Sequence, residues 1–193
     1  MRQRMLDTIE GLLQQGESFT ELSVERIVNE VGISRSTFYV YFEDKGHLLR
    51  ALTDDVLEQM IATSRGWWAN LPTANFEEVE AGIEQLIETY RAHSILMAAI
   101  VDTSTYDEDV RAELHKLIVG GQEELAEQIR AGQKAGTVRE DLDPERTAGW
   151  LSWMVEHGLH ELVREADDPE AKALGRALAR ILWNAIYPKP APA

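Results

Sequence analysis

The 193-residue sequence contains no cysteine, which excludes disulfide bonds, thiolate nucleophiles and cysteine-ligated zinc or iron–sulfur sites. Long apolar runs are also missing, and no stretch approaches the roughly 18 residues that a membrane-spanning helix needs. The first seven residues carry charge and amphipathic spacing in place of the continuous apolar region of a secretory signal. These absences predict a cytoplasmic protein without a membrane partner.

Positive charge is scarce, because 19 lysines and arginines face 34 aspartates and glutamates for a net charge of −15. An acidic balance argues at first against a nucleic-acid partner. The acidic excess is uneven, however. Residues 1–50 carry 6 basic and 8 acidic side chains, whereas residues 51–193 carry 13 and 26. The N-terminal region is therefore nearly neutral, which leaves DNA open as its partner.

Sequence motifs of common enzymes are absent as well: there is no G-x-S-x-G elbow, Walker A loop, H-E-x-x-H pair or G-x-G-x-x-G loop. His157 and His160 share one helix face, but a zinc site would need further ligands from elsewhere. The sequence predicts neither an enzyme nor a bound metal or cofactor.

Apolar residues recur at helical spacing along almost the whole chain, and no stretch shows the alternation of a strand. We expect an all-α fold of about nine helices. The expected helices follow the apolar stripes at 5–13, 24–31, 34–42, 48–61, 76–90, 95–101 and 110–129. Two more open at Asp143-Pro144-Glu145 and Asp168-Pro169-Glu170, in each of which the aspartate is the expected N-cap and the proline the first helical residue.

Several helix starts carry capping residues. Ser23, Ser34 and Asp44 precede apolar stripes, and Asn75 with Glu78 has the spacing of a capping box. Gly32 lies directly after the second stripe, where a glycine commonly ends a helix. The first helices are therefore short and separated by tight turns.

Residues 23–49 contain two short helices around the turn at Gly32, which is the spacing of a helix-turn-helix that places its second helix in the major groove of DNA. Residues 32–49 read GISRSTFYVYFEDKGHLL. This text closely resembles the signature of the TetR family of transcriptional repressors. The resemblance covers the N-terminal part of the chain at motif level, and the remaining helices match the family in outline.

Hydrogen-bond donors gather on the second of these helices, and hydroxyl and guanidinium groups can reach phosphates and base edges. Lys45 lies at the N-terminus of the next helix, where backbone N–H groups could help hold a phosphate. The resemblance implies the same division: bases for Ser34, Arg35, Ser36 and Thr37, and phosphates for Tyr39, Tyr41 and Lys45, with Ser23 as a further phosphate contact. The same tyrosines, in the alternative interpretation, are core aromatics. Arg2 and Arg4 are expected to form a basic N-terminal arm.

The resemblance implies a one-component regulator of the repressor type, with three regions. A helix-turn-helix DNA-binding domain is expected at 1–46, a ligand-binding and dimerisation domain at 47–187, and a disordered tail at 188–193. The implied partners are palindromic double-stranded operator DNA, a second copy of the chain, and a hydrophobic small-molecule effector that releases the DNA.

The implied effector pocket has candidate walls in the second region, because aromatic side chains with a few polar groups are typical of small-molecule cavities. The candidates are Tyr90, Met97, Trp150, Trp153, Met154, His157, Trp183 and Asn184. The order of the tryptophans, with Trp183-Asn184 near the C-terminus, is similar to the TetR subgroup of ethionamide-activation repressors, whose pocket is long and apolar. Packing in the core or at a dimer interface is the alternative for each tryptophan.

The last two helices are expected to form the dimer interface, because small residues near Leu178 would allow two helices to approach closely. The expected stripe is Leu174, Leu178, Ile181, Leu182 and Ala185, with Gly175, Ala177 and Ala179 between them. An α-helical lipid-binding or carrier protein is the competing interpretation. Such a protein would not need the exposed hydroxyls around Ser36 and Thr37.

Overall fold

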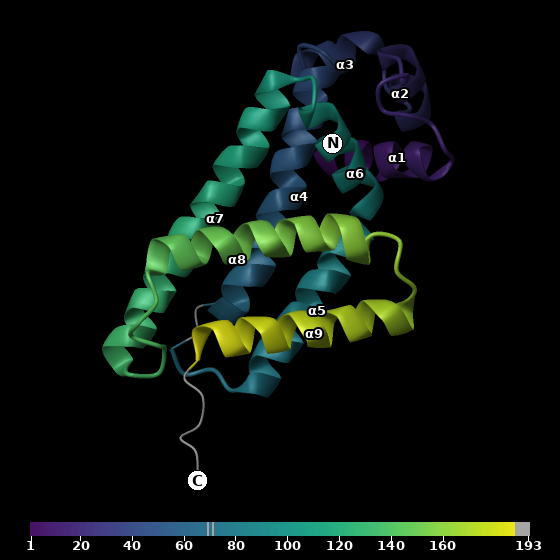
Figure 1. Ribbon diagram of the computed structural model, residues 1–193. Helices are drawn as coiled ribbons and strands as arrows, with labels where there is room; N and C mark the ends of the chain where they lie inside the picture. Colours follow the sequence, from purple (N-terminus) through teal and green to yellow (C-terminus); the bar gives the residue numbers. More distant parts are fainter. Residues whose placement is uncertain (69, 71, 188–193) are drawn as a thin grey trace. The chain divides into compact units, whose positions relative to one another are not determined.

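The computed structural model describes the backbone of residues 1–68, 70 and 72–187, and the side chains of these residues except 2, 67, 68 and 117. The predicted tail at 188–193 lies outside the described residues. All regular structure in the described chain is helical, as predicted (Figure 1). The helices are α1 (Arg2–Gln14), α2 (Val24–Val31), α3 (Arg35–Tyr41), α4 (Lys45–Trp68), α5 (Phe76–Ala92), α6 (Ser94–Ser104), α7 (Glu108–Ala135), α8 (Pro144–Gly158), a π-helical turn η1 (Leu159–Val163) and α9 (Asp168–Ile186). None of the described helices is long and apolar enough to cross a membrane.

The predicted caps hold the helix starts. Ser23 accepts a hydrogen bond from the backbone N–H of Arg26 at 3.1 Å, and Asp143 accepts one from Arg146 at 2.9 Å. Asn75 and Glu78 form a reciprocal capping box: the Asn75 N–H donates to Glu78 Oε2 and the Glu78 N–H donates to Asn75 Oδ1, both at 2.9 Å. These local sequence signals therefore set where the helices begin.

The last helix begins one residue earlier than predicted. Asp167, not Asp168, is the N-cap of α9, and its carboxylate accepts from the backbone N–H of Glu170 at 2.9 Å. Proline is tolerated within the first helical turn, so Pro169 is compatible with either start. Asp167 lies three residues before the N–H group that it bonds, which is the usual spacing of an N-cap. The prediction that Asp168 is the N-cap is therefore wrong.

The predicted basic arm is also wrong, because α1 already begins at Arg2. A guanidinium N–H of Arg4 donates to the backbone oxygen of Val31 at 2.5 Å. Val31 is the last residue of α2, where carbonyl groups lack partners within the helix. Arg4 therefore joins α1 to the end of α2.

The chain divides into two units, and the first comprises Met1–Glu58 with His93–His115. In this unit α1 packs against α2 and α6, and α2 packs against α3. His93 Nδ1 lies 2.7 Å from Glu10 Oε1, and both side chains are largely buried. Fully buried apolar residues from α1 to α4 form the core: Met5, Leu6, Ile9, Leu12, Ile27, Phe38, Leu48, Leu49 and Leu52.

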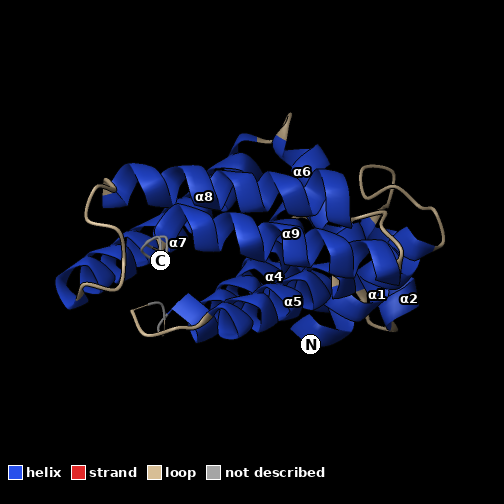
Figure 2. Ribbon diagram, turned by 60° about the horizontal axis from the view of Figure 1, so that its bottom comes forward, coloured by secondary structure: helices blue, strands red, loops and turns tan. Residues whose placement is uncertain are grey.

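The second unit comprises Gln59–Ala92 with Lys116–Ala193. Within it α9 packs along α5, η1 contacts both helices, and α8 runs alongside α9 in the opposite direction (Figure 2). The α9 residues that face this core are Ala171, Gly175, Ala179, Leu182 and Ile186. A Cβ atom added to Gly175 would lie 3.0 Å from Ile87 Cδ1, so α5 and α9 pack closely at this point.

Two of the small residues expected at a dimer interface thus have another role. Gly175 and Ala179 are buried within the chain, where they let α9 approach α5. Ile181 remains 51% exposed, and Leu174 and Leu178 are half-buried. Leu182 of the expected stripe is buried as well, so the part of α9 that a partner could reach contains Leu174, Leu178 and Ile181.

Candidate nucleic-acid interface and effector site

A tight turn joins α2 to α3. Gly32 adopts φ +73°, a left-handed conformation that glycine adopts without steric cost. The Val28 carbonyl accepts from the N–H groups of Gly32 at 2.9 Å and Ile33 at 3.0 Å, which completes the C-terminal cap of α2. Ser34 then caps α3 by accepting from the Thr37 N–H at 3.0 Å. The two short helices and their turn form the predicted helix-turn-helix.

Helix α3 has one buried face. Phe38 is completely buried and contacts the ring of Phe42, with centroids 5.5 Å apart. The remaining side chains of α3 point outward to different extents: Arg35, Ser36, Tyr39, Val40 and Tyr41 are exposed and Thr37 is half-buried. Tyr39 and Tyr41 are therefore surface residues, and only Phe38 and Phe42 of this aromatic cluster belong to the core.

The donors at the start of α3 form a local network. Ser34 Oγ lies 2.7 Å from Ser36 Oγ and 2.8 Å from Thr37 Oγ1. On the adjacent face, a hydrogen bond with Tyr39 raises the pKa of Arg35. Ser23, at the start of α2, is exposed as well. Seven of the eight predicted DNA-contacting side chains thus lie at or near the surface, at the N-terminus of α2 and along α3 with its N-cap.

Lys45 is the exception. Its Nζ donates to the backbone oxygens of Phe19 at 2.9 Å, Thr20 at 2.7 Å and Leu22 at 2.9 Å. An ammonium group has three donors, so all of them are used within the chain. Burial lowers the pKa of Lys45, while these carbonyls favour its charged form. Lys45 thus joins the start of α4 to the loop before α2. The sequence pattern predicted a phosphate contact for Lys45 and did not indicate this role.

The predicted effector residues do not share one environment. Tyr90 is 2% exposed, burial raises its pKa to about 12, and its hydroxyl lacks a hydrogen-bond partner. Trp183 is half-buried and stacks on Tyr187 with ring centroids 4.0 Å apart. Met97 is buried in α6, which belongs to the first unit. The pocket role of these residues stays a prediction.

Five other predicted effector residues lie on the surface. Trp150 is 78% exposed, Trp153 44% and Met154 37%, and His157 and Asn184 are exposed too. The buried side of α8 consists of the smaller residues Ala148 and Leu151. Trp150 and Trp153 are spaced so that they point away from the side of α8 that carries Ala148 and Leu151. They therefore form an exposed apolar face of α8 in place of the predicted enclosed wall.

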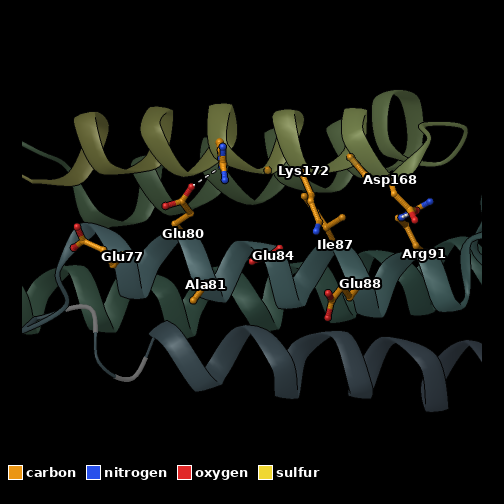
Figure 3. Close-up of a pocket in the computed structure, with 12 residues that line it drawn as sticks. Glu77, Glu80, Ala81, Glu84, Ile87, Glu88, Arg91, Asp168 and Lys172 are labelled. Carbon is orange, nitrogen blue, oxygen red and sulfur yellow. Dashed lines mark hydrogen bonds and ion pairs between the residues drawn. The ribbon is translucent and has the colours of Figure 1, made fainter.

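A groove of about 480 Å³ lies between α5 and α9 (Figure 3). Glutamates of α5 line one side, and Glu80 pairs with Arg176 of α9 at 3.2 Å. Arg91 pairs with Asp168 at 2.8 Å at one end. None of the predicted effector residues lines this groove, and its charged walls differ from the apolar cavity that was expected.

Several polar groups are buried inside the second unit, and Ser152 and Glu156 among them had no signal in the sequence. Ser152 Oγ and His160 Nδ1 are buried without hydrogen-bond partners, as is the Tyr90 hydroxyl. Burial raises the pKa of Glu156, against the opposing effect of His157 and His160. Ser152, Glu156 and His160 recur every four residues, a spacing that places side chains on one helix face. Among the described residues no group of three or more histidine, aspartate or glutamate side chains is placed to hold a metal ion.

Two family models match the chain. Residues 10–52 match the model of bacterial regulatory proteins of the tetR family, and residues 79–188 match the model of the C-terminal domain of the transcriptional regulator EthR. The fold and the helix-turn-helix thus define an all-α transcriptional regulator. The chain belongs to the TetR family, in its EthR subgroup, and this family consists of regulators, not enzymes.

Curated relatives agree with this assignment. The chain is 31% identical over 96 residues to the HTH-type transcriptional regulator EthR of Mycobacterium tuberculosis, across 49% of this chain and 44% of the relative. It is 29% identical over 89 residues to EthR of Mycolicibacterium smegmatis, across 46% of this chain and 41% of the relative. The matches thus span less than half the length of these relatives.

Solved structures share the fold over nearly the whole chain. A TetR-family regulator from Mesorhizobium loti superposes with a TM-score of 0.74 at 15% identity, and covers 97% of this chain and 96% of its own. A regulator from Saccharomonospora viridis in complex with choline has a TM-score of 0.72 at 20% identity, with coverage of 97% and 98%. FadR from Bacillus subtilis, in complex with stearoyl-CoA, has a TM-score of 0.72 at 16% identity, with coverage of 97% and 100%.

Proposed function

We propose that this protein is a dimeric repressor that binds palindromic operator DNA through α3 and is released from it by a hydrophobic small molecule. The observation that carries the proposal is the exposed face of α3, held in place by the buried Phe38 and the turn at Gly32. Membership of the TetR family supports it. The proposed DNA-binding domain is residues 1–46, and residues 47–187 form the ligand-binding and dimerisation domain.

The exposed donors have assigned roles in this proposal. Side chains at the N-terminal end of α3, from Ser34 to Thr37, contact base edges, while Tyr39 and Tyr41 contact phosphates, with Ser23 as a further phosphate contact. Lys45 contacts phosphate only after exchanging one of its three carbonyl partners. Without that exchange its contribution to DNA binding is indirect, through the position of the loop before α2.

The exposed apolar face of α8 and the larger exposed side chains of α9 form the proposed dimer interface. Trp150 and Ile181 are 78% and 51% exposed in the single chain. A contiguous exposed apolar patch on a soluble protein commonly marks an interaction site, and a two-fold axis would bury the same patch on both copies. Four helices, two from each chain, would then form a bundle.

The effector site is proposed within the second unit. Tyr90 supports it, because a buried hydroxyl without a partner is costly unless water or a ligand satisfies it. The choline and stearoyl-CoA bound to two structural neighbours show that this fold holds small molecules of very different size. The effector would act by favouring a dimer whose two α3 helices no longer fit successive major grooves.

Selection of binding sites from a random duplex library tests the DNA-binding proposal. The wild-type protein should enrich a palindromic sequence, and Thr37→Ala should weaken binding to it about 5- to 100-fold. Thr73→Ala, in the exposed loop before α5, is the matched control and should bind like the wild type. Binding of an apolar ligand by a protein that enriches no DNA sequence would favour the carrier interpretation.

A further inference from the structure

Val40 lies on the side of α3 that points away from the core. Successive residues of an α-helix are turned by about 100°, so Val40 lies about 200° from Phe38 around the helix axis. Phe38 is completely buried, whereas Val40 is 78% exposed. The outward face of α3 therefore presents an apolar side chain at its centre, beside Ser36, which is turned from Phe38 by an equal angle.

The neighbours of Val40 on this face are polar and already hydrogen-bonded to Ser34. Ser36 and Thr37 lie within about 60° of Val40 around the helix, and both hydroxyls contact Ser34 Oγ. Val40 has no such partner to bond, and at 78% exposure it adds little buried area to the core. A β-branched residue is also a weaker helix former than most alternatives at an exposed position. Neither folding nor local hydrogen bonding explains a valine here.

The major groove of DNA offers a partner of matching chemistry. The base edges present hydrogen-bond donors and acceptors, and thymine adds its C5 methyl group, which accepts apolar contacts. We propose that Val40 reads a thymine in each operator half-site by packing against this methyl group. This inference rests on the proposed DNA binding and deepens it by naming the base that α3 recognises.

Uracil isolates the proposed contact, because it pairs like thymine and lacks only the methyl group. Loss of one buried methyl contact corresponds to about a fourfold loss of affinity in each half-site, and to about fifteenfold in both. Val40→Ala, which lacks the two valine methyl groups, should bind the thymine duplex less tightly than the wild type does. Its affinity should then fall only slightly further when uracil replaces the thymine.

The experiment uses the full-length protein and the duplex that the wild type enriches from a random library. Each thymine is replaced by uracil, one symmetric pair at a time, and affinity is measured by fluorescence anisotropy at one fixed salt concentration. At one pair the wild type should lose about fifteenfold and Val40→Ala less than about threefold. Equal uracil penalties for the two proteins at every pair would overturn the assignment.

Two further variants keep the test decisive. Val155→Ala changes a half-buried valine of α8 and should show the wild-type uracil profile. If Val40→Ala binds no duplex, Val40→Thr retains the β-branched shape and one methyl, and should show a uracil penalty below that of the wild type. Failure of the wild type to enrich any sequence would instead contradict the proposed DNA binding, and the Val40 assignment with it.

Discussion

Helices α3 and α8 each present a large apolar side chain to solvent, but in different surroundings. Val40 and Trp150 are both 78% exposed. Val40 is flanked by hydroxyl groups at the end of a seven-residue helix, whereas Trp150 is followed on α8 by Trp153 and Met154, which are exposed too. An isolated apolar group among donors suits the major groove, and a continuous apolar face suits a second protein chain. Val40 and Trp150 are equally exposed, but their different surroundings indicate different partners.

The largest expected effect comes from placing the same charge on both helices. Trp150→Glu should weaken dimerisation by about a hundredfold or more, because a charge buried in an apolar interface remains unpaired. Val40→Glu should leave the dimer intact and abolish operator binding, because the carboxylate would face the DNA phosphates. Sedimentation analysis and anisotropy measure the two properties separately. Dissociation of the dimer by Val40→Glu, or an intact dimer in Trp150→Glu, would contradict the division of roles.

Lys45 offers the next largest effect, which is on stability. Lys45→Met keeps most of the apolar stem but removes the ammonium from the oxygens of Phe19, Thr20 and Leu22. The free energy of unfolding should fall by about 2 kcal/mol, because these oxygens lose a charged donor. Urea unfolding measures it, and Lys134→Met at an exposed position of α7 serves as a control with a smaller expected change. Unchanged stability, with a lower salt dependence of DNA binding, would show that Lys45 acts as a phosphate contact alone.

A smaller effect is expected for Gly175. Gly175→Val should destabilise the protein by about 1 to 3 kcal/mol, because the new side chain would meet Ile87, whose Cδ1 lies 3.0 Å from an added Cβ. Gly120→Ala in α7 is the control: nothing lies within 4 Å of its added Cβ, and the change should stabilise the helix by about 0.5 to 1 kcal/mol. Thermal unfolding compares them. If Gly175→Val weakened the dimer without lowering monomer stability, Gly175 would belong to the interface between copies.

The smallest expected effect concerns Glu156 and depends on pH. Burial raises the pKa of Glu156, so the folded protein binds its proton more tightly than the unfolded chain does. Stability should therefore fall as pH rises from the unfolded pKa to the folded one, and stay lower above it. Glu156→Gln should stabilise the protein at neutral pH, by less than about 1 kcal/mol. Unfolding curves between pH 4 and 8 should show this gain vanish on acidification, and a constant gain would exclude ionisation as its cause.

Local sequence signals predicted most of the fold. A side chain such as Ser23, Ser34, Asn75 or Asp143 caps a helix through an N–H group only three residues away, so the signal and the structure lie in one short segment. The turn at Gly32 is local in the same way. For the candidate site, the exposed position of the α3 donors followed from the helical spacing around Phe38.

Contacts between distant segments were decided only by the tertiary structure. The sequence assigned Lys45 to phosphate, since nothing near it indicated that the oxygens of Phe19, Thr20 and Leu22 would surround its ammonium. The same holds for Arg4, which bonds a carbonyl 27 residues away. Helical periodicity groups residues onto faces, but it does not say which face meets a neighbouring helix. Packing of α9 inside the chain buried Gly175, Ala179 and Leu182, and left Ile181 and Trp150 exposed to a partner.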